Sequence, residues 1–195
     1  MKKIPNKYAV FIAVLVTILV VSGVTYAAFS DKAKQTGASF SVGSSDIKLL
    51  KSITGGVDAD NLADEISGPS FSNITPSWTS DYALKVYNNA TTSIQLTSNA
   101  NYLTANDPDD LRSILYVEPI GWNDTNSNGI GDAGETGVSY GRKTFVKWKT
   151  EGYDFGQVTP GSIKGLLLRF STDAVSDTKQ GKSAVFDFEF NSVGL

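Results

Sequence analysis

Neither cysteine nor histidine occurs anywhere in this sequence. The absence of cysteine excludes disulfide bonds and thiol nucleophiles, so the fold must depend on a hydrophobic core large enough to need no covalent cross-links. The absence of histidine removes the commonest general base and the commonest zinc ligand. Zinc proteases of the His-Glu-x-x-His kind are therefore excluded, and we predict that the protein is not an enzyme.

Clusters of basic residues are also missing beyond the first 27 residues. That part of the chain holds all 20 acidic residues but only 14 of the 17 basic ones, which gives it a net charge near −6. Proteins that bind nucleic acid present a concentrated positive surface to the phosphate backbone, so nucleic acid is not expected as a partner. An acidic chain of this kind suits a soluble, secreted surface.

The chain has one long apolar run, and it lies at the N-terminus. Three lysines in Met1–Lys7 precede the apolar segment Tyr8–Val21, and small residues follow up to Ala27. This layout predicts a signal peptide at residues 1–27, cleaved after Ala27, and a secreted protein of the extracellular space, cell surface or biofilm matrix. The alternative is an uncleaved anchor, since Tyr8–Phe29 is long enough to span a bilayer of about 30 Å.

Alternation with a period of two residues dominates the rest of the sequence. It is clearest at Ser183–Ser192, where Ala184, Phe186, Phe188 and Phe190 share one face. The pattern predicts an all-β, jelly-roll-like antiparallel β-sandwich at residues 38–195. The expected strands are Ala38–Val42, Asp46–Leu50, Asp81–Asn88, Thr91–Ser98, Ser113–Trp122, Gly141–Lys149, Gly165–Thr172 and Ser183–Ser192.

Local signals add three smaller expectations. Asn88–Ala90 is typical of a hairpin turn between the two strands on either side of it. Short helices are expected at Asp58–Ile66 and at Asp107–Leu111. The three tryptophans favour core or sheet-edge packing over a sugar-binding platform; they are Trp78, Trp122 and Trp148.

The segment DTNSNGIGDAGE, Asp124–Glu135, is the most specific motif in the chain. It matches the calcium loop Asp-x-Asn-x-Asn-Gly-x-x-x-x-x-Glu at every defined position. Ca²⁺ takes six to eight oxygen ligands, and alternate residues of such a loop supply them. The predicted ligands are the side chains of Asp124, Asn126, Asn128, Asp132 and Glu135 and the carbonyl of Ile130.

This loop is predicted to be a structural insertion at residues 123–136 rather than a sensor. A switching site needs flanking helices that reorient, whereas the flanking sequences here read as strands. The segment resembles the calcium loops of bacterial surface adhesin domains. The alternative is a plain turn, because Asn, Asp and Gly also favour loops that hold no metal.

A second group of carboxylates is weaker evidence for a metal. Asp107, Asp109 and Asp110 surround a proline, and a solvated turn explains them better than a second ion does.

Two sequence blocks near the export junction resemble the TasA/camelysin family of secreted biofilm-matrix fibre proteins. The first is GVTYAAFSD at Gly23–Asp31. The second has the spacing Phe-x-x-Gly-x-x-Asp-Ile-x-Leu and begins at Phe40. A looser third block runs from Pro76 to Asn89, with Ser77 where the family has glycine. The firm part of the resemblance covers Gly23–Leu49.

The resemblance implies a fibre subunit that polymerises by donor-strand exchange, in which the mature N-terminus of one copy completes a sheet of the next. It assigns this donor strand to residues 28–37. The pairing residues would be Ala28, Phe29, Ser30, Asp31, Lys32, Ala33, Lys34, Gln35 and Thr36. The expected partners are further copies of the chain and other matrix components, and the membrane is met only through the signal segment before cleavage. The alternative is a cell-surface adhesin domain held by an uncleaved anchor.

Overall fold

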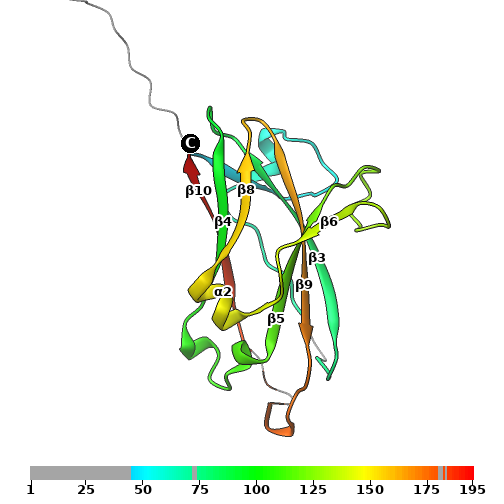
Figure 1. Cartoon of the computed structure of the whole chain (residues 1–195), viewed down its shortest axis with the longest axis vertical. Coiled ribbons are helices and arrows are strands. Elements are labelled where there is room, and N and C mark those ends of the chain that lie inside the picture. The colour runs from blue at the N-terminus through cyan, green and yellow to red at the C-terminus, as the bar shows by residue number, and fades with distance from the viewer. Residues whose placement is uncertain (1–44, 72–73, 180–181, 183) are drawn as a thin grey trace, which may run out of the picture. The chain divides into compact units, whose positions relative to one another are not determined.

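The computed structural model describes residues 45–71, 74–179, 182 and 184–195. The predicted signal peptide (1–27), the predicted donor strand (28–37) and the expected strand at Ala38–Val42 lie outside these residues. Two antiparallel sheets, of seven and three strands, enclose a shared core (Figure 1). The predicted all-β antiparallel sandwich is thus confirmed. Within the described part of the chain, no helix has the length and apolar character needed to cross a membrane.

The larger sheet has the strand order β2-β1-β3-β9-β5-β6, with β7 also paired to β5, and the smaller sheet has the order β10-β4-β8. The larger sheet is formed by β1 (Ile47–Leu50), β2 (Leu62–Ala63), β3 (Thr79–Asn88), β5 (Leu115–Trp122), β6 (Thr136–Ser139), β7 (Lys143–Thr144) and β9 (Ile163–Thr172). The smaller sheet is formed by β4 (Ile94–Asn101), β8 (Tyr153–Val158) and β10 (Asp187–Gly194).

Six of the predicted strands are present, as β1, β3, β4, β5, β9 and β10. Their alternation also gives the correct buried face. Phe186, Phe188 and Phe190 pack against the core, while Asp187 and Glu189 are exposed. The sequence did not identify β2, β6 or β8. β2 has only two residues, β6 is exposed along its whole length, and the glycine at position 156 interrupts the pattern of β8.

The prediction of a strand at Gly141–Lys149 is wrong. Only Lys143–Thr144 is extended, and the chain then forms the helix α2 (Phe145–Glu151). Thr144 caps this helix by accepting a hydrogen bond from the Lys147 amide at 3.2 Å, the role that threonine commonly plays at an N-cap. Phe145 and Trp148, three residues apart, form its buried face. An i, i+3 pair suits a helix of two turns and would point to opposite faces of a strand.

The predicted hairpin turn at Asn88–Ala90 is also wrong, because β3 and β4 lie in different sheets and the turn carries the chain from one sheet to the other. Asn88 is fully buried there, and its amide donates to the carbonyls of Thr92 and Val158 at 3.0 and 2.9 Å. The two expected helices are wrong. Within Asp58–Ile66 the chain forms a 3₁₀ turn at Ala59–Asn61 and then β2, and a 3₁₀ turn at Leu111–Ser113 shares only Leu111 with the other. Two further 3₁₀ turns lie at Thr104–Asn106 and Asp177–Lys179.

An aromatic cluster occupies the space between the sheets. Trp148 is fully buried, and its indole N–H donates to the Ser98 hydroxyl at 3.0 Å. Its ring stacks on Phe188 of the small sheet at 5.3 Å between centroids. Trp122 is 6% exposed, and Trp78 is partly buried against Phe71. The expectation that the tryptophans serve packing is therefore confirmed.

Candidate functional site

The predicted calcium segment forms the connection between β5 and β6, which are neighbouring antiparallel strands. The Asn123 amide donates to the Glu135 carbonyl at 2.9 Å and closes the loop at its base. Figure 1 shows this connection projecting beside the larger sheet, beyond β6. The predicted insertion at residues 123–136 therefore corresponds to the loop between the end of β5 and the start of β6.

Asp124, the first predicted ligand, is the buried centre of the loop. Its side chain is 0% exposed. Oδ1 accepts a hydrogen bond from the Asn128 amide at 3.0 Å, and Oδ2 accepts one from the Gly129 amide at 3.2 Å. Gly129 has a φ of 75°, a conformation that costs little only for glycine. The glycine in the motif is thus explained by the turn that brings its amide to Asp124.

The two asparagines among the predicted ligands form consecutive turns. The Asn126 oxygen accepts from the Asn128 amide at 2.9 Å, and the Asn128 oxygen accepts from the Ile130 amide at 2.7 Å. Both side-chain amides donate to Asp132 Oδ2, at 2.9 and 2.7 Å. The side chains at the third, fifth and ninth positions of the loop therefore meet at one point.

Glu135 fastens the end of the loop to its beginning. Oε1 accepts hydrogen bonds from the Thr125 hydroxyl at 2.7 Å and the Thr125 amide at 2.9 Å. Oε2 accepts from the Asp132 amide at 3.3 Å. Hydrogen bonds lower the pKa of Glu135 because these donors stabilise the carboxylate. The bond from the Thr125 hydroxyl has the largest effect, and those from backbone amides have smaller ones. These hydrogen bonds favour the ionised form of Glu135, the last predicted ligand of the motif.

The donor set of this loop fits Ca²⁺ better than it fits zinc. All six predicted ligands offer oxygen, which Ca²⁺ prefers. Across the described ranges of the chain, no three acidic side chains converge as a metal-binding group. An ion here would therefore need the amide oxygens of Asn126 and Asn128 and the carbonyl of Ile130 as well as carboxylates.

Lys85 in β3 is the residue that the sequence analysis missed. Its Nζ donates to Asp124 Oδ2 at 2.9 Å and to the Ile53 carbonyl at 2.6 Å, and it lies 5.1 Å from the centre of the Trp122 ring. Lys85 and Asp124 are 39 residues apart in the sequence. In the sheet, β9 lies between β3, which carries Lys85, and β5, which leads into the loop with Asp124. Only the sheet topology brings them together, so no local pattern could have indicated this pair.

The loop also docks against the outer face of the larger sheet. A Cβ atom at Gly131 would lie 2.3 Å from Leu167 Cδ1, so the loop backbone approaches the Leu167 side chain closely. Ile53 packs beside Gly129 and also contacts the small cluster of Ile120, Trp122 and Leu167. The loop is therefore part of a second, minor core on this side of the sheet.

The second carboxylate group consists of Asp107, Asp109 and Asp110. The prediction that these residues form a solvated turn is wrong for Asp107. Asp107 is 1% exposed and accepts hydrogen bonds from the amides of Leu111 and Arg112 at 2.7 and 3.0 Å. The Arg112 guanidinium adds an ion pair at 3.0 Å. Asp109 and Asp110 pair with Lys182 and Arg112 at 3.4 and 2.9 Å. These carboxylates organise the turn between β4 and β5.

Replacing Asp107 by alanine is expected to destabilise the domain by about 3 kcal/mol, because two amides and a guanidinium lose a buried acceptor. For a domain of this size that corresponds to a fall of roughly 6–12 °C in the melting temperature. Asp109→Ala is the matched control and should cost less than about 1 kcal/mol, since its pair is partly exposed. Equal thermal shifts for the two variants would contradict the assigned role of Asp107.

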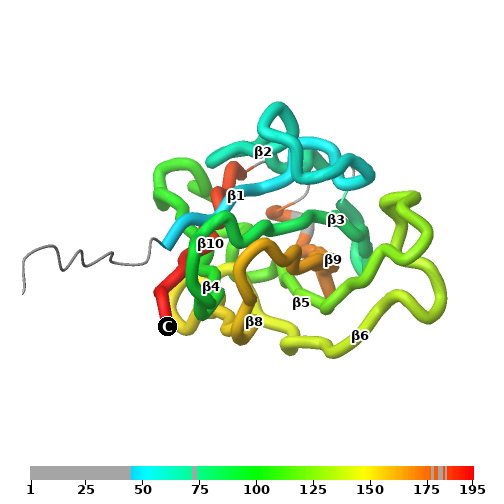
Figure 2. Tube along the Cα trace, turned by 90° about the horizontal axis from the view of Figure 1, so that it is seen from above, coloured from blue at the N-terminus to red at the C-terminus, as the bar shows by residue number. Residues whose placement is uncertain are grey.

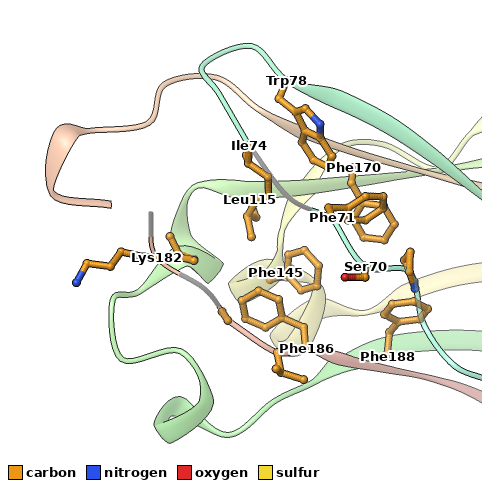
Figure 3. Close-up of a pocket in the computed structure, with 14 residues that line it drawn as sticks. Ser70, Phe71, Ile74, Trp78, Leu115, Phe145, Phe170, Lys182, Phe186 and Phe188 are labelled. Atoms are coloured by element: carbon orange, nitrogen blue, oxygen red, sulfur yellow. The ribbon is translucent and has the colours of Figure 1, made fainter. Parts of the chain in front are cut away.

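Figure 2 shows β10 of the small sheet near β1 of the larger sheet, and among the described residues no strand pairs between them. A hollow of about 430 Å³ lies there, lined by Ile47 and Leu49 of β1 and by Phe188 and Phe190 of β10. A second hollow of about 380 Å³ adjoins it and shares Phe186 and Phe188. Figure 3 shows the rings of Phe71, Phe145, Phe186 and Phe188 around this second hollow, with the Lys182 side chain pointing away. The first hollow lies along β10 and is called the groove below.

Comparison with known proteins gives no match: no family model matches the sequence, and no curated protein is significantly similar to it. The resemblance to the TasA/camelysin family therefore rests on the sequence blocks described above alone.

Proposed function

We propose that this protein is the structural subunit of an extracellular filament or biofilm-matrix fibre. In this proposal, jelly-roll sandwiches are joined head to tail by exchange of the N-terminal strand at residues 28–36. The observation that carries the proposal is the hollow between β10 and β1 in the described part of the chain, where half-buried phenylalanines line a groove along β10. A groove of this kind can accept an added strand, whose backbone supplies hydrogen bonds and whose side chains fill the pockets.

The calcium loop has a supporting role in the proposed fibre. Asp124, Asn126, Asn128, Ile130, Asp132 and Glu135 would hold the ion. A bound Ca²⁺ would cross-link the β5–β6 connection and stiffen it, which is useful outside cells, where millimolar Ca²⁺ can occupy weak sites. No residue of this chain is assigned a catalytic role in the proposal.

Electron microscopy of the purified chain beginning at Ala28 tests this function. Filaments are expected in millimolar Ca²⁺, because a head-to-tail contact of this kind does not close on itself. N-terminal sequencing of the exported protein should begin at Ala28; an intact Tyr8–Phe29 segment would favour the anchored adhesin instead. A protein that begins at Ala28 and stays monomeric at high concentration would overturn the proposal.

A further inference from the structure

The edge of the small sheet has the properties of an acceptor. β10 pairs with β4 along its whole length, from Asp187 opposite Asn101 to Gly194 opposite Ile94. On its other side it has no strand partner among the described residues. Phe188 and Phe190 on its inward face, and Phe186 just before it, are only partly buried. Two of these rings nevertheless stack on core rings, Phe186 on Phe145 at 4.4 Å and Phe188 on Trp148 at 5.3 Å. An unpaired edge beside half-exposed phenylalanines is a surface that proteins normally cover.

Acidic side chains surround the groove next to this edge. The first hollow is lined by Asp64, Glu65, Asp187 and Glu189 in addition to its apolar residues. Lys48 neutralises Asp64, with 2.6 Å between Nζ and Oδ1. Within the described ranges, Glu65, Asp187 and Glu189 have no ion-pair partner, and Glu189 accepts only a hydrogen bond from the Asn101 amide. A strand that carries positive charge would be attracted to this rim.

The geometry points to one occupant and one register. We propose that residues 28–36 of a second copy add antiparallel to β10, with Lys34 opposite Asp187 and Lys32 opposite Glu189. This inference rests on the proposed function, and it assigns the acceptor strand, the direction of the donor and the residues that recognise each other.

The alternation of side chains supports this pairing. Lys32 and Lys34 share one face of an extended strand, and Phe29 and Ala33 share the other. With the lysines turned outward, they meet the outward carboxylates of β10, and opposite charges across neighbouring strands stabilise the pair. Phe29 and Ala33 then face the groove. Asp31 shares this inward face and would lie near Phe190, which is only partly buried, so its carboxylate can stay hydrated.

The direction follows from where the chain enters the domain. The Ser45 hydroxyl donates to the Ser192 carbonyl at 3.0 Å, so the chain enters beside the end of β10 (Figure 1). In a head-to-tail stack, the end of β10 in one copy lies next to the start of β10 in the following copy. Residue 36 of the first copy would then lie near the start of β10 in the following copy, and residue 28 near its end. The donor therefore runs opposite to β10. Residues 37–44 supply at most about 29 Å of extended chain for this step.

The absence of cysteine makes the pairing directly testable by disulfide cross-linking. Directly opposite residues in an antiparallel pair have Cα atoms about 4.5–5.5 Å apart, within the range that a disulfide spans. The double variants K32C/E189C and K34C/D187C, in the chain that begins at Ala28, should each give a ladder of covalent oligomers after oxidation. K32C/D187C and K34C/E189C, which match a parallel donor, should link at least tenfold more slowly.

Charge reversal gives a second readout. K32E/K34E and D187K/E189K should each slow filament growth at least tenfold, and the quadruple variant should recover to within a few-fold of the parent. D58K/D60K changes the same number of exposed carboxylates elsewhere and should leave growth unchanged.

The outcomes separate this inference from the proposed function. Filaments that form without the K32C/E189C and K34C/D187C ladders, or with the parallel combinations linking instead, overturn the pairing alone. A parent chain that forms no filaments overturns the proposed function and the pairing with it.

Discussion

A chain that begins at Gly37 instead of Ala28 is expected to fold normally and to form no filaments. It retains every strand and every core residue of the described part, which begins at residue 45. It loses the segment that would add to β10. About eight backbone hydrogen bonds at a net 0.5–1.5 kcal/mol each supply at least about 4 kcal/mol, which corresponds to roughly a thousandfold in affinity.

Electron microscopy and light scattering measure this loss. Trp78, Trp122 and Trp148 all lie in the described domain, so an unchanged fluorescence spectrum reports that the truncated chain is folded. A peptide of residues 28–36 should bind this chain and raise its melting temperature, whereas a peptide of scrambled sequence should not. Filaments of normal width from the truncated chain would show that residues 28–36 are only a tail.

Replacing Lys85 by methionine is expected to make the stability of the domain strongly dependent on Ca²⁺. Asp124 is fully buried, and Lys85 is its ion-pair partner. Removing one partner of a buried pair leaves an uncompensated charge and costs about 3–5 kcal/mol. Methionine keeps the length and apolar volume of the side chain, so this loss should appear fully when a chelator removes Ca²⁺.

Calcium should reverse most of that loss, because a divalent ion next to Asp124 replaces the missing ammonium. The parent should gain about 2.7 kcal/mol at a hundredfold excess of Ca²⁺ over the dissociation constant, and Lys85→Met should gain more. Thermal melting in chelator and in millimolar Ca²⁺ measures both gains. The control Asp124→Ala with Glu135→Ala removes two predicted ligands and should melt at the same temperature in both conditions.

If Ca²⁺ shifts the melting temperature of neither the parent nor Lys85→Met, the calcium proposal is wrong. An equal shift in both would mean that Lys85 does not compete with the ion.

The local features of this protein could be predicted because each is encoded within a short stretch of sequence. The alternation of Phe186, Phe188 and Phe190 identified both β10 and its buried face. The calcium motif is contiguous, so its turns at Gly129 and its contacts between Asn126, Asn128 and Asp132 lie within one loop. The two-residue alternation of a strand and the twelve-residue spacing of the calcium motif both depend only on local backbone geometry.

Pairing between distant segments was decided by the tertiary structure. Lys85 reaches Asp124, and Asp107 is buried under its own turn, although nothing near these residues in the sequence marks the contact. The turn at Asn88 sends the chain to the opposite sheet instead of closing a hairpin, and α2 forms where a strand was expected because Phe145 and Trp148 must both reach the core. Local preferences differ by about 1 kcal/mol or less per residue, whereas burying one aromatic side chain contributes about 1.5–3 kcal/mol. Packing in the complete fold therefore outweighs the local signal wherever the two disagree.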